Sequence, residues 1–506
     1  MTSSPGSWAV VAWSVAVAAA AARLVPLLRG GGLTGLGNYD DGVYYAAGTA
    51  LAHGRLPYAD YLLLHPPGIV LALAPFGLLA RLVGDPVGLA AARLGWIALG
   101  AVGSVLVARL LRGQGLVLAA LGGLAYAVAP PAVYTGWTPM LETPAATCVL
   151  LALLVLHRTS PDDGDRGRVP ARRAVLAGVL LGLSADLKIW GVASVLAVVA
   201  WYLARGARRN AAEVLLGALV SVAAVCLPFF LTSPGAMWRM VVLDQLGRGR
   251  SQVPLVARVA GILGVAGPGG DGAGARWAAA SALVLAAGLA VVLVVAAARM
   301  VPSARLAVLL TVVHTGVLLT GPSWFRHYPA LVTGPLVVAT VSGAGALVRH
   351  VGAARPRAGR CLLAVLALAV AALALPLAGE RLGTPFPGAA LGAAARARAG
   401  CVTSDDPAAL AAMDVLSSDL ARGCPFVADL GGYSYELARE RGRATPRSSD
   451  AAWQRLYLEH LRAGTTALPF RYAPQQSPST ARAVAAWPVL AGRGRFVLRE
   501  PDGRSP

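Results

Sequence analysis

The sequence predicts an all-α bundle of about eleven membrane spans followed by a small α/β domain. Three observations predict it. Of the 506 residues, 57% are hydrophobic and 13% charged, apolar runs of bilayer length recur, and the last part of the chain turns polar. A soluble protein cannot cover so much apolar surface with polar side chains. We therefore divide the chain into a membrane part, residues 1–378, and a C-terminal domain, residues 379–506.

The spans are assigned from apolar runs of roughly 15–23 residues, near the length that crosses a bilayer. The runs cover residues 8–28, 91–111, 115–135, 141–157, 174–187, 189–204, 211–231, 277–298, 306–321, 329–348 and 361–378. A further apolar segment from Ile69 to Val83 is interrupted by Pro75 and flanked by Arg81 and Asp85. We expect it to lie along the membrane or dip into it, with a spanning helix as the alternative.

The formal net charge of +20 is carried mainly by arginines in short loops. These arginines form no stripe with interleaved aromatic residues, so we expect no nucleic-acid partner. Five arginine-bearing loops fall on one side if the spans alternate, and the positive-inside rule makes that side the cytoplasm. We therefore expect a plasma-membrane protein with a cytoplasmic N-terminus and an extracytoplasmic C-terminal domain. The five loops begin at Arg109, Arg158, Arg205, Arg299 and Arg349.

The C-terminal domain alternates helical and strand-like segments. A helix is expected from Pro407 to Ala421, capped by Asp405 or Asp406, and a short strand from Pro425 to Leu430. Cys401 and Cys424 also lie here. If the domain is outside the cytoplasm, a disulfide between them is chemically reasonable, and two unpaired thiols are the alternative.

The first outer loop carries the clearest chemical signal. It begins Asn38-Tyr-Asp-Asp-Gly-Val-Tyr-Tyr, so that Asp40 and Asp41 are adjacent carboxylates just beyond the first span. Burial and mutual repulsion at the water–lipid boundary can raise one pKa and make that carboxylate a usable general base. A solvated turn is the alternative, because Asp-Gly is a common turn dipeptide.

This loop resembles the GT-C superfamily of integral-membrane glycosyltransferases. The resemblance rests on the carboxylate pair before Tyr44 and Tyr45, a Gly-x-x-Pro-Tyr turn at 54–58 and an x-Pro-Pro-Gly turn at 65–68. It looks most like the protein mannosyltransferase and aminoarabinose transferase group and the bacterial polyprenyl-phosphate-mannose-dependent enzymes. The similarity covers residues 1–378. Supporting pieces are residues 182–188, which end in Lys188, and 325–329.

The resemblance implies transfer of a sugar, of the mannose or arabinose type, from a polyprenyl-phosphate donor outside the cytoplasm. The acceptor would be a cell-envelope glycan, glycolipid or protein. One first-loop aspartate would be the base of an inverting transfer, and we favour Asp41 slightly over Asp40. No nucleotide-binding fingerprint occurs in the sequence, and we expect neither a cofactor nor a metal.

A departing lipid phosphate requires cations at the outer ends of the helices. Lys188 is the only lysine of the chain, and a lysine snorkelling to water is the alternative interpretation. Glu142 begins the fourth predicted span, where a carboxylate must face protein or water, so we expect it to line the acceptor pocket. The candidates for the phosphate are Lys188, Arg326, His327, Arg248 and Arg250, and those for the acceptor or pocket are His65, Tyr44 and Glu142.

A polytopic transporter or lipid flippase is the rival interpretation. It predicts functional polar groups near the bilayer midplane and repeated halves with broken helices. Here the polar residues concentrate in the outer loops, which favours the glycosyltransferase. A non-catalytic membrane anchor is a second rival, but it gives no reason for Asp40 beside Asp41 in a proline-rich loop.

Overall fold

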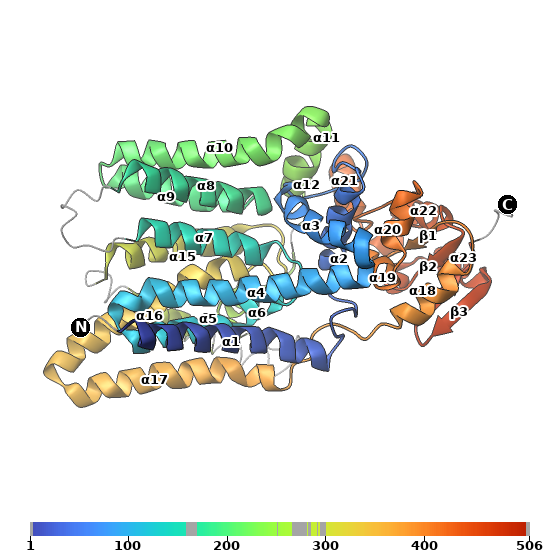
Figure 1. Ribbon diagram of the computed structural model, residues 1–506. Coiled ribbons are helices and arrows are strands. Elements are labelled where there is room, and N and C mark those ends of the chain that lie inside the picture. The colour runs from blue at the N-terminus through green and yellow to red at the C-terminus, as the bar shows by residue number, and fades with distance from the viewer. Residues whose placement is uncertain are drawn as a thin grey trace.

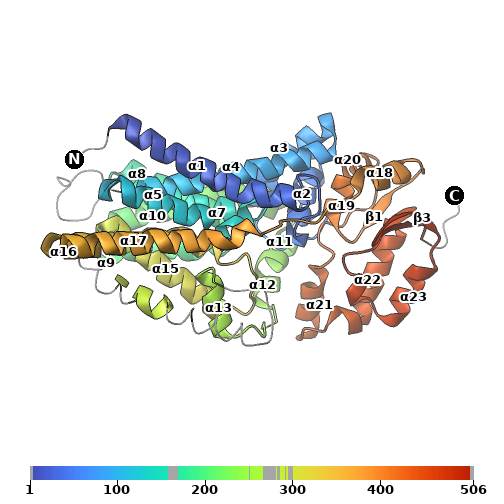
Figure 2. The same cartoon turned by 90° about the horizontal axis from the view of Figure 1, so that it is seen from below.

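The computed structural model describes residues 4–157, 169–249, 251–265, 281, 285–290, 292–293 and 300–501. Long helices lie side by side in a bundle, and a smaller domain with a sheet covers one end of it (Figure 1). The N-terminus lies at the opposite end of the bundle (Figure 2). The predicted class, a mostly helical membrane protein with a small C-terminal sheet, is therefore confirmed.

The helices of the bundle are apolar and close their own backbone hydrogen bonds, as a chain in lipid must. Six of the described helices are long and apolar enough to span a membrane, and a seventh is added if α5 and α6, bent by 59°, count as one. The protein is thus an integral membrane protein. Every predicted run overlaps helical residues. Most of the run 277–298 lies outside the described residues, so the total of about eleven spans stays a prediction. The bundle helices are α1 (Pro5–Arg29), α4 (Asp85–Leu111), α5 (Leu116–Val128), α6 (Pro130–Gly136), α7 (Glu142–Leu156), α8 (Ala171–Leu187), α9 (Gly191–Ala204), α10 (Arg208–Thr232), α15 (Pro302–Thr320), α16 (Ala330–Ala354) and α17 (Pro356–Ala374).

The bend between α5 and α6 has a specific cause. Pro131 has no N–H to donate to the carbonyl of Ala127, one helical turn earlier. Arg23, fully buried in α1, supplies the missing donor at 3.0 Å and also donates to the Ala132 carbonyl at 3.1 Å. A buried cation in a membrane bundle is tolerated here because it satisfies backbone oxygens, including the Ala127 carbonyl that Pro131 leaves free.

Short helices cover the end of the bundle that faces the C-terminal domain (Figures 1 and 2). The segment expected to lie along or dip into the membrane is helix α3, which packs on α2. Glycines allow this close approach, since a Cβ at Gly48 would lie 2.6 Å from the Leu73 Cβ and one at Gly77 2.7 Å from the Thr49 Cα. The short helices are α2 (Tyr39–Ala52), α3 (Gly68–Val83), α11 (Pro234–Trp238), the π-helical turn η2 (Arg239–Leu243), α12 (Asp244–Leu246) and α13 (Leu255–Ile262).

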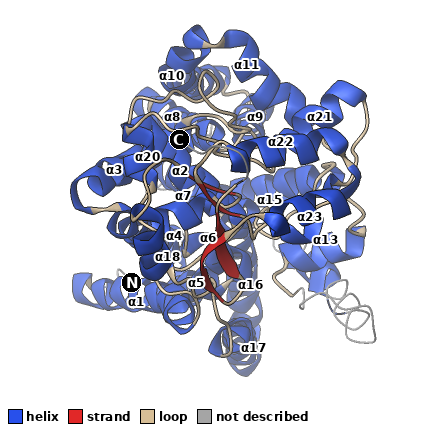
Figure 3. Cartoon of the chain, turned by 90° about the vertical axis from the view of Figure 1, so that its right-hand side faces the viewer, coloured by secondary structure: helices blue, strands red, loops and turns tan. Residues whose placement is uncertain are grey.

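The C-terminal domain holds a four-stranded sheet in the order β1-β2-β4-β3 (Figure 3). β1 (Val402–Ser404) and β2 (Thr466–Leu468) are parallel, and β4 (Phe496–Arg499) is antiparallel to β2 and to β3 (Val489–Arg493). The helices of the domain are α18 (Gly388–Arg396), α19 (Pro407–Ala412), α20 (Leu416–Ala421), α21 (Tyr433–Arg441), α22 (Ala451–Arg462) and α23 (Pro478–Ala486).

Two local predictions in this domain are corrected. The helix expected from Pro407 to Ala421 is capped by Asp406 but breaks into α19 and α20 at Asp414, which has a φ of 59°. The break brings the Asp414 carboxylate to the N-terminus of α4, where it accepts a hydrogen bond of 2.8 Å from the Asp85 N–H. The strand expected from Pro425 to Leu430 is wrong. This segment is a loop whose side chains pack in two directions. Phe426 meets the Tyr61 ring of the membrane part at 5.3 Å, and Leu430 packs beside Trp453 of α22.

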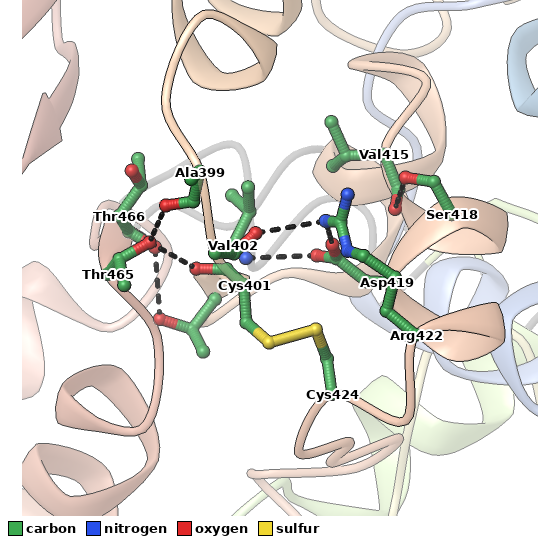
Figure 4. Close-up of a disulfide and its surroundings, with 12 residues drawn as sticks. Ala399, Cys401, Val402, Val415, Ser418, Asp419, Arg422, Cys424, Thr465 and Thr466 are labelled. Atoms are coloured by element: carbon green, nitrogen blue, oxygen red, sulfur yellow. Dashed lines mark hydrogen bonds and ion pairs between the residues drawn. A yellow bond between two sulfur atoms is a disulfide. The ribbon is translucent and has the colours of Figure 1, made fainter. Parts of the chain in front are cut away.

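Cys401 and Cys424, the pair singled out in the sequence, are joined by a disulfide (Figure 4). Beside it, the Val402 N–H donates to the Asp419 carboxylate at 2.9 Å, and Arg422 pairs with the same carboxylate. The disulfide and these contacts hold strand β1 against the end of α20.

The C-terminal domain is packed onto α2 and α4. A Cβ at Gly42 of α2 would lie 2.8 Å from the Ala408 Cβ of α19, so only a glycine allows the two helices to approach this closely. Arg439 of α21 pairs with Asp244 at 2.6 Å, and the Ser417 N–H donates to Asp85 at 2.8 Å. One hydrophobic cluster runs from α2 into α19 and α20. The domain is thereby placed directly over the first-loop carboxylates.

Candidate active site

Asp40 and Asp41 lie in the first turn of α2, where the unpaired backbone N–H groups of a helix favour negative charge. Asp41 is fully buried. It forms an ion pair with Arg93 of α4 at 3.4 Å and accepts a hydrogen bond from the Thr138 hydroxyl. Arg93 also donates to the Leu33 carbonyl at 2.7 Å. Asp41 therefore attaches the start of α2 to the bundle.

Asp40 has different surroundings. Its side chain is 38% exposed, so a substrate can reach it. The protein around it nevertheless raises the pKa of Asp40 to about 7, because burial disfavours the charged form and the carboxylates of Asp429 and Glu142 repel it. The cations of Arg248 and Lys188 oppose this rise. A carboxyl with a pKa near neutrality has the property required of a general base.

Lys188 lies in the turn between α8 and α9 and forms an ion pair with Glu142, the first residue of α7. Its ammonium also lies 4.3 Å from the ring centre of Tyr328 and 4.9 Å from that of Trp190, in cation–π contacts. Both side chains of the pair are buried, and Glu142 Oε2 has no hydrogen-bond partner in the structure. The ion pair fixes the ammonium at the end of the bundle that faces the C-terminal domain.

His327 lies between the carboxylates of Asp40 and Glu142. Its Nδ1 is 3.9 Å from Asp40 Oδ2, and its Nε2 is 3.7 Å from Glu142 Oε1. Burial and the nearby cations Lys188 and Arg248 hold the pKa of His327 well below its usual range. The imidazole is therefore neutral at physiological pH, with one nitrogen able to donate a hydrogen bond and the other to accept one.

Arg248 follows α12 and is held by aromatic side chains. It donates from Nη1 to the Tyr328 hydroxyl at 3.1 Å, and its guanidinium lies 4.3 Å from the ring centre of Tyr435 of the C-terminal domain. Its Nε is buried without a hydrogen-bond partner. None of the ion pairs among the described residues involves Arg248, so its charge is free to meet an external anion. We call Asp40, Glu142, Lys188, Arg248, His327 and Tyr328 the outer cluster.

The other predicted candidates lie around this cluster or beyond it. His65 and Tyr44 are in ring contact at 5.5 Å, and burial, then Lys188 and Arg248, hold the pKa of His65 well below its usual range. Arg326 is at the rim: its side chain is 68% exposed, pairs with Glu380 at 3.6 Å and covers the ring of Tyr134. Arg250 lies outside the described residues. Within the described part of the chain, no group of three His, Cys, Asp or Glu side chains is placed to hold a metal ion.

The sequence analysis missed several residues of the site. Arg93 carried a signal, since an ionisable residue within an apolar run almost always faces the interior of a bundle and has a partner. Tyr328 lies in the segment 325–329 that supported the resemblance, but Asp429 and Tyr435 carried no signal. Asp429 and Tyr435 come from the C-terminal domain, and Asp429 accepts a hydrogen bond of 3.1 Å from Tyr39, the residue before Asp40. The C-terminal domain therefore contributes directly to the site.

Comparison with known proteins rests on structure. No family model matches the chain, and no curated protein matches it in sequence. ArnT from Cupriavidus metallidurans in the apo state gives a TM-score of 0.62 at 16% identity, over 98% of both chains. The same protein bound to undecaprenyl phosphate gives 0.57 at 15%, again over 98% of both chains. The chain has the GT-C fold. An oligosaccharyltransferase from Archaeoglobus fulgidus gives 0.53 at 13% identity, over 94% of this chain and 71% of that one.

The GT-C resemblance predicted from the loop motifs is thus confirmed at the level of the fold. The match to ArnT spans nearly the whole chain, so the GT-C likeness extends into the C-terminal domain, beyond residues 1–378. The outer cluster lies where the GT-C bundle meets that domain, since Tyr435 and Asp429 approach Arg248 and Asp40 there.

The ion pair between Asp41 and Arg93 should make the single variant less stable than the double variant. Replacing Arg93 with Gln leaves a buried carboxylate without its cation, and we expect this to lower the free energy of unfolding by about 3–5 kcal/mol. The double variant Asp41→Asn/Arg93→Gln should recover part of this loss, because neither charge is then left unpaired. Unfolding in detergent micelles measures both variants. Equal stabilities of wild type and Arg93→Gln would contradict the anchoring role of Asp41.

Proposed function

We propose that the protein is a membrane glycosyltransferase that moves a sugar from a polyprenyl-phosphate donor to a hydroxyl group of an acceptor. One observation carries the proposal: Asp40, with a pKa of about 7, faces the cations Lys188 and Arg248 at the outer end of a GT-C bundle. The ArnT structure bound to undecaprenyl phosphate supports it, because that protein shares this fold and holds a lipid phosphate.

The cluster supplies the groups that an inverting transfer needs. Asp40 removes the proton from the acceptor hydroxyl as its oxygen attacks the anomeric carbon. A new glycosidic bond forms, the bond from that carbon to the phosphate oxygen breaks, and the polyprenyl phosphate departs with the electron pair. Lys188 and Arg248 stabilise the negative charge that develops on this phosphate. Asp40 is our choice of base over Asp41, because Asp41 is already bound to Arg93 and Thr138. No cofactor or metal enters this scheme.

We further propose that the reaction takes place outside the cytoplasm. Arg109 and Arg349 lie in the last turns of α4 and α16, and Arg205 directly follows α9. These helix ends lie at the end of the bundle away from the C-terminal domain (Figures 1 and 2). The positive-inside rule assigns that end to the cytoplasm. The disulfide between Cys401 and Cys424 supports an oxidising compartment for the opposite end.

The proposals for the sugar and for the acceptor rest on the sequence motifs. A donor sugar of the mannose or arabinose type and a cell-envelope glycan, glycolipid or protein as acceptor stay predictions from the loop motifs. The test is to incubate membranes that carry the protein with a panel of radiolabelled polyprenyl-phosphate sugars and to follow which label moves.

A transporter or lipid flippase is favoured by one observation. Asp186 of α8 is buried and accepts hydrogen bonds from Ser221 at 2.9 Å and from Cys226 at 3.3 Å, both on α10. Buried acids inside a bundle are typical of transport pathways. The two proposals differ in which acid they require, since transport would tolerate loss of Asp40 and fail on loss of Asp186.

Replacing Asp40 with Asn should lower the rate of sugar transfer by roughly 10²–10⁴-fold, because the variant keeps the shape of the side chain but loses the base. Binding of the donor should be retained. Asp60→Asn is the matched control, since Asp60 is an exposed acid of the same outer loop. Initial rates with a polyprenyl-phosphate sugar measure the effect, and unchanged transfer by Asp40→Asn rules out this assignment of the base.

The rate should also depend on pH. The base acts when deprotonated, so kcat/KM should rise with pH, bend near the pKa of about 7 and then level off. Removing the repulsion from Asp429 by Asp429→Asn should lower the pKa of Asp40, and the bend should move to lower pH. A bend in the same place in both proteins would show that Asp429 does not act on the base.

A further inference from the structure

The C-terminal domain contains a pocket that the proposed reaction leaves without a role. Its volume is about 450 Å³, within the range of sites for small molecules. It lies between α21, the 3₁₀ turns η4 (Arg447–Ser449) and η5 (Ala473–Gln475), and Gly249 of the outer loop. Polar side chains on its wall include Ser434, Thr445, Arg447, Ser448 and Gln475, and Tyr435 supplies an aromatic ring.

Arg447 organises the pocket wall. Its Nη1 donates to Gln475 Oε1 at 3.0 Å, and its Nη2 donates to the Gly431 carbonyl at 3.0 Å and to Ser434 Oγ at 3.1 Å. Its Nε is buried and has no hydrogen-bond partner. A buried donor without a partner is uncommon in a folded protein.

The pocket adjoins the outer cluster through two residues. Tyr435 lines the pocket, and its ring lies under the guanidinium of Arg248, which donates to Tyr328 of the cluster. Gly431 makes the second link: its carbonyl accepts from Arg447, and its N–H donates to the Tyr39 hydroxyl at 3.0 Å. Since Tyr39 precedes Asp40 in α2, these contacts link the pocket wall to the proposed base.

The chemistry of the wall favours a sugar ring. Fixed hydroxyl, amide and guanidinium groups suit the closely spaced hydroxyls of a sugar, and an aromatic ring suits its C–H face. An extended peptide needs the free edge of a sheet, and none of the strands lines this pocket. The wall also has apolar members, Ala438, Ala444, Pro446 and Pro474, which suit the C–H faces of a sugar ring.

We propose that this pocket is an acceptor subsite that binds a sugar ring of a glycan acceptor and presents a neighbouring hydroxyl to Asp40. The proposal rests on the proposed function, which requires a hydroxyl acceptor near that carboxylate. It assigns the C-terminal domain a role in acceptor selection.

Saturation-transfer NMR on the full-length protein in lipid nanodiscs tests it without catalysis. The probes are methyl glycosides and disaccharides of mannose, arabinose, glucose and N-acetylglucosamine, together with a Ser/Thr-containing peptide. We expect at least one sugar to bind, and Ser448→Trp, which fills the pocket, to weaken this binding at least tenfold. Ser449→Trp is the matched control, because Ser449 is the next residue, is also exposed and does not line the pocket. Asp40→Asn should bind the sugar as the wild type does.

Thermal stabilisation by decaprenyl phosphate shows that each variant is folded and keeps its donor site. The proposal is overturned if no sugar binds, if only the peptide binds, or if Ser448→Trp and Ser449→Trp bind the sugar equally. If sugars bind but the wild type transfers none of the donor sugars to any of them or to membrane components, the proposed function fails and the pocket stands as a sugar-binding site.

Discussion

The buried ion pair between Lys188 and Glu142 determines what the rest of the outer cluster can do. It fixes a buried ammonium at the end of the bundle that faces the C-terminal domain, and charge interactions are strong for a buried group. The ammonium contributes to keeping His327 neutral, and Glu142 contributes to raising the pKa of Asp40. Arg248 adds a second cation without a carboxylate of its own among the described residues. The cluster therefore combines a base near neutrality with positive charge for an anion.

This electrostatic balance depends on the C-terminal domain. Asp429 and Tyr435 of that domain lie against Asp40 and Arg248, and much of the rise in the pKa of Asp40 comes from being covered. The glycine at position 42 allows α19 to seat closely on α2, and Arg439 fixes the loop that carries Arg248 by pairing with Asp244. Bundle and domain thus form one site, and the structural match to ArnT covers both of them.

The sequence predicted the parts of this arrangement that depend on composition and local pattern: the helical membrane bundle, the small C-terminal sheet and the carboxylate pair of the first loop. It did not separate Asp40 from Asp41, because their difference arises from Arg93, 52 residues away, and from Asp429 in another domain. The strand expected at Pro425–Leu430 failed for a similar reason. Its apolar residues have the pattern of a strand, but they pack as a loop between two clusters, with Phe426 on Tyr61 of the membrane part and Leu430 beside Trp453.

The most direct measurement of the central claim is photo-crosslinking with a decaprenyl phosphate that carries a diazirine next to its phosphate. If the cations of the outer cluster hold the lipid phosphate, peptides with crosslinks should contain Lys188, Arg248 or the segment from Phe325 to Tyr328. Competition by unlabelled decaprenyl phosphate should remove these crosslinks. Crosslinks confined to α17 or to the arginine-rich turn between α16 and α17 at the other end of the bundle would contradict the account.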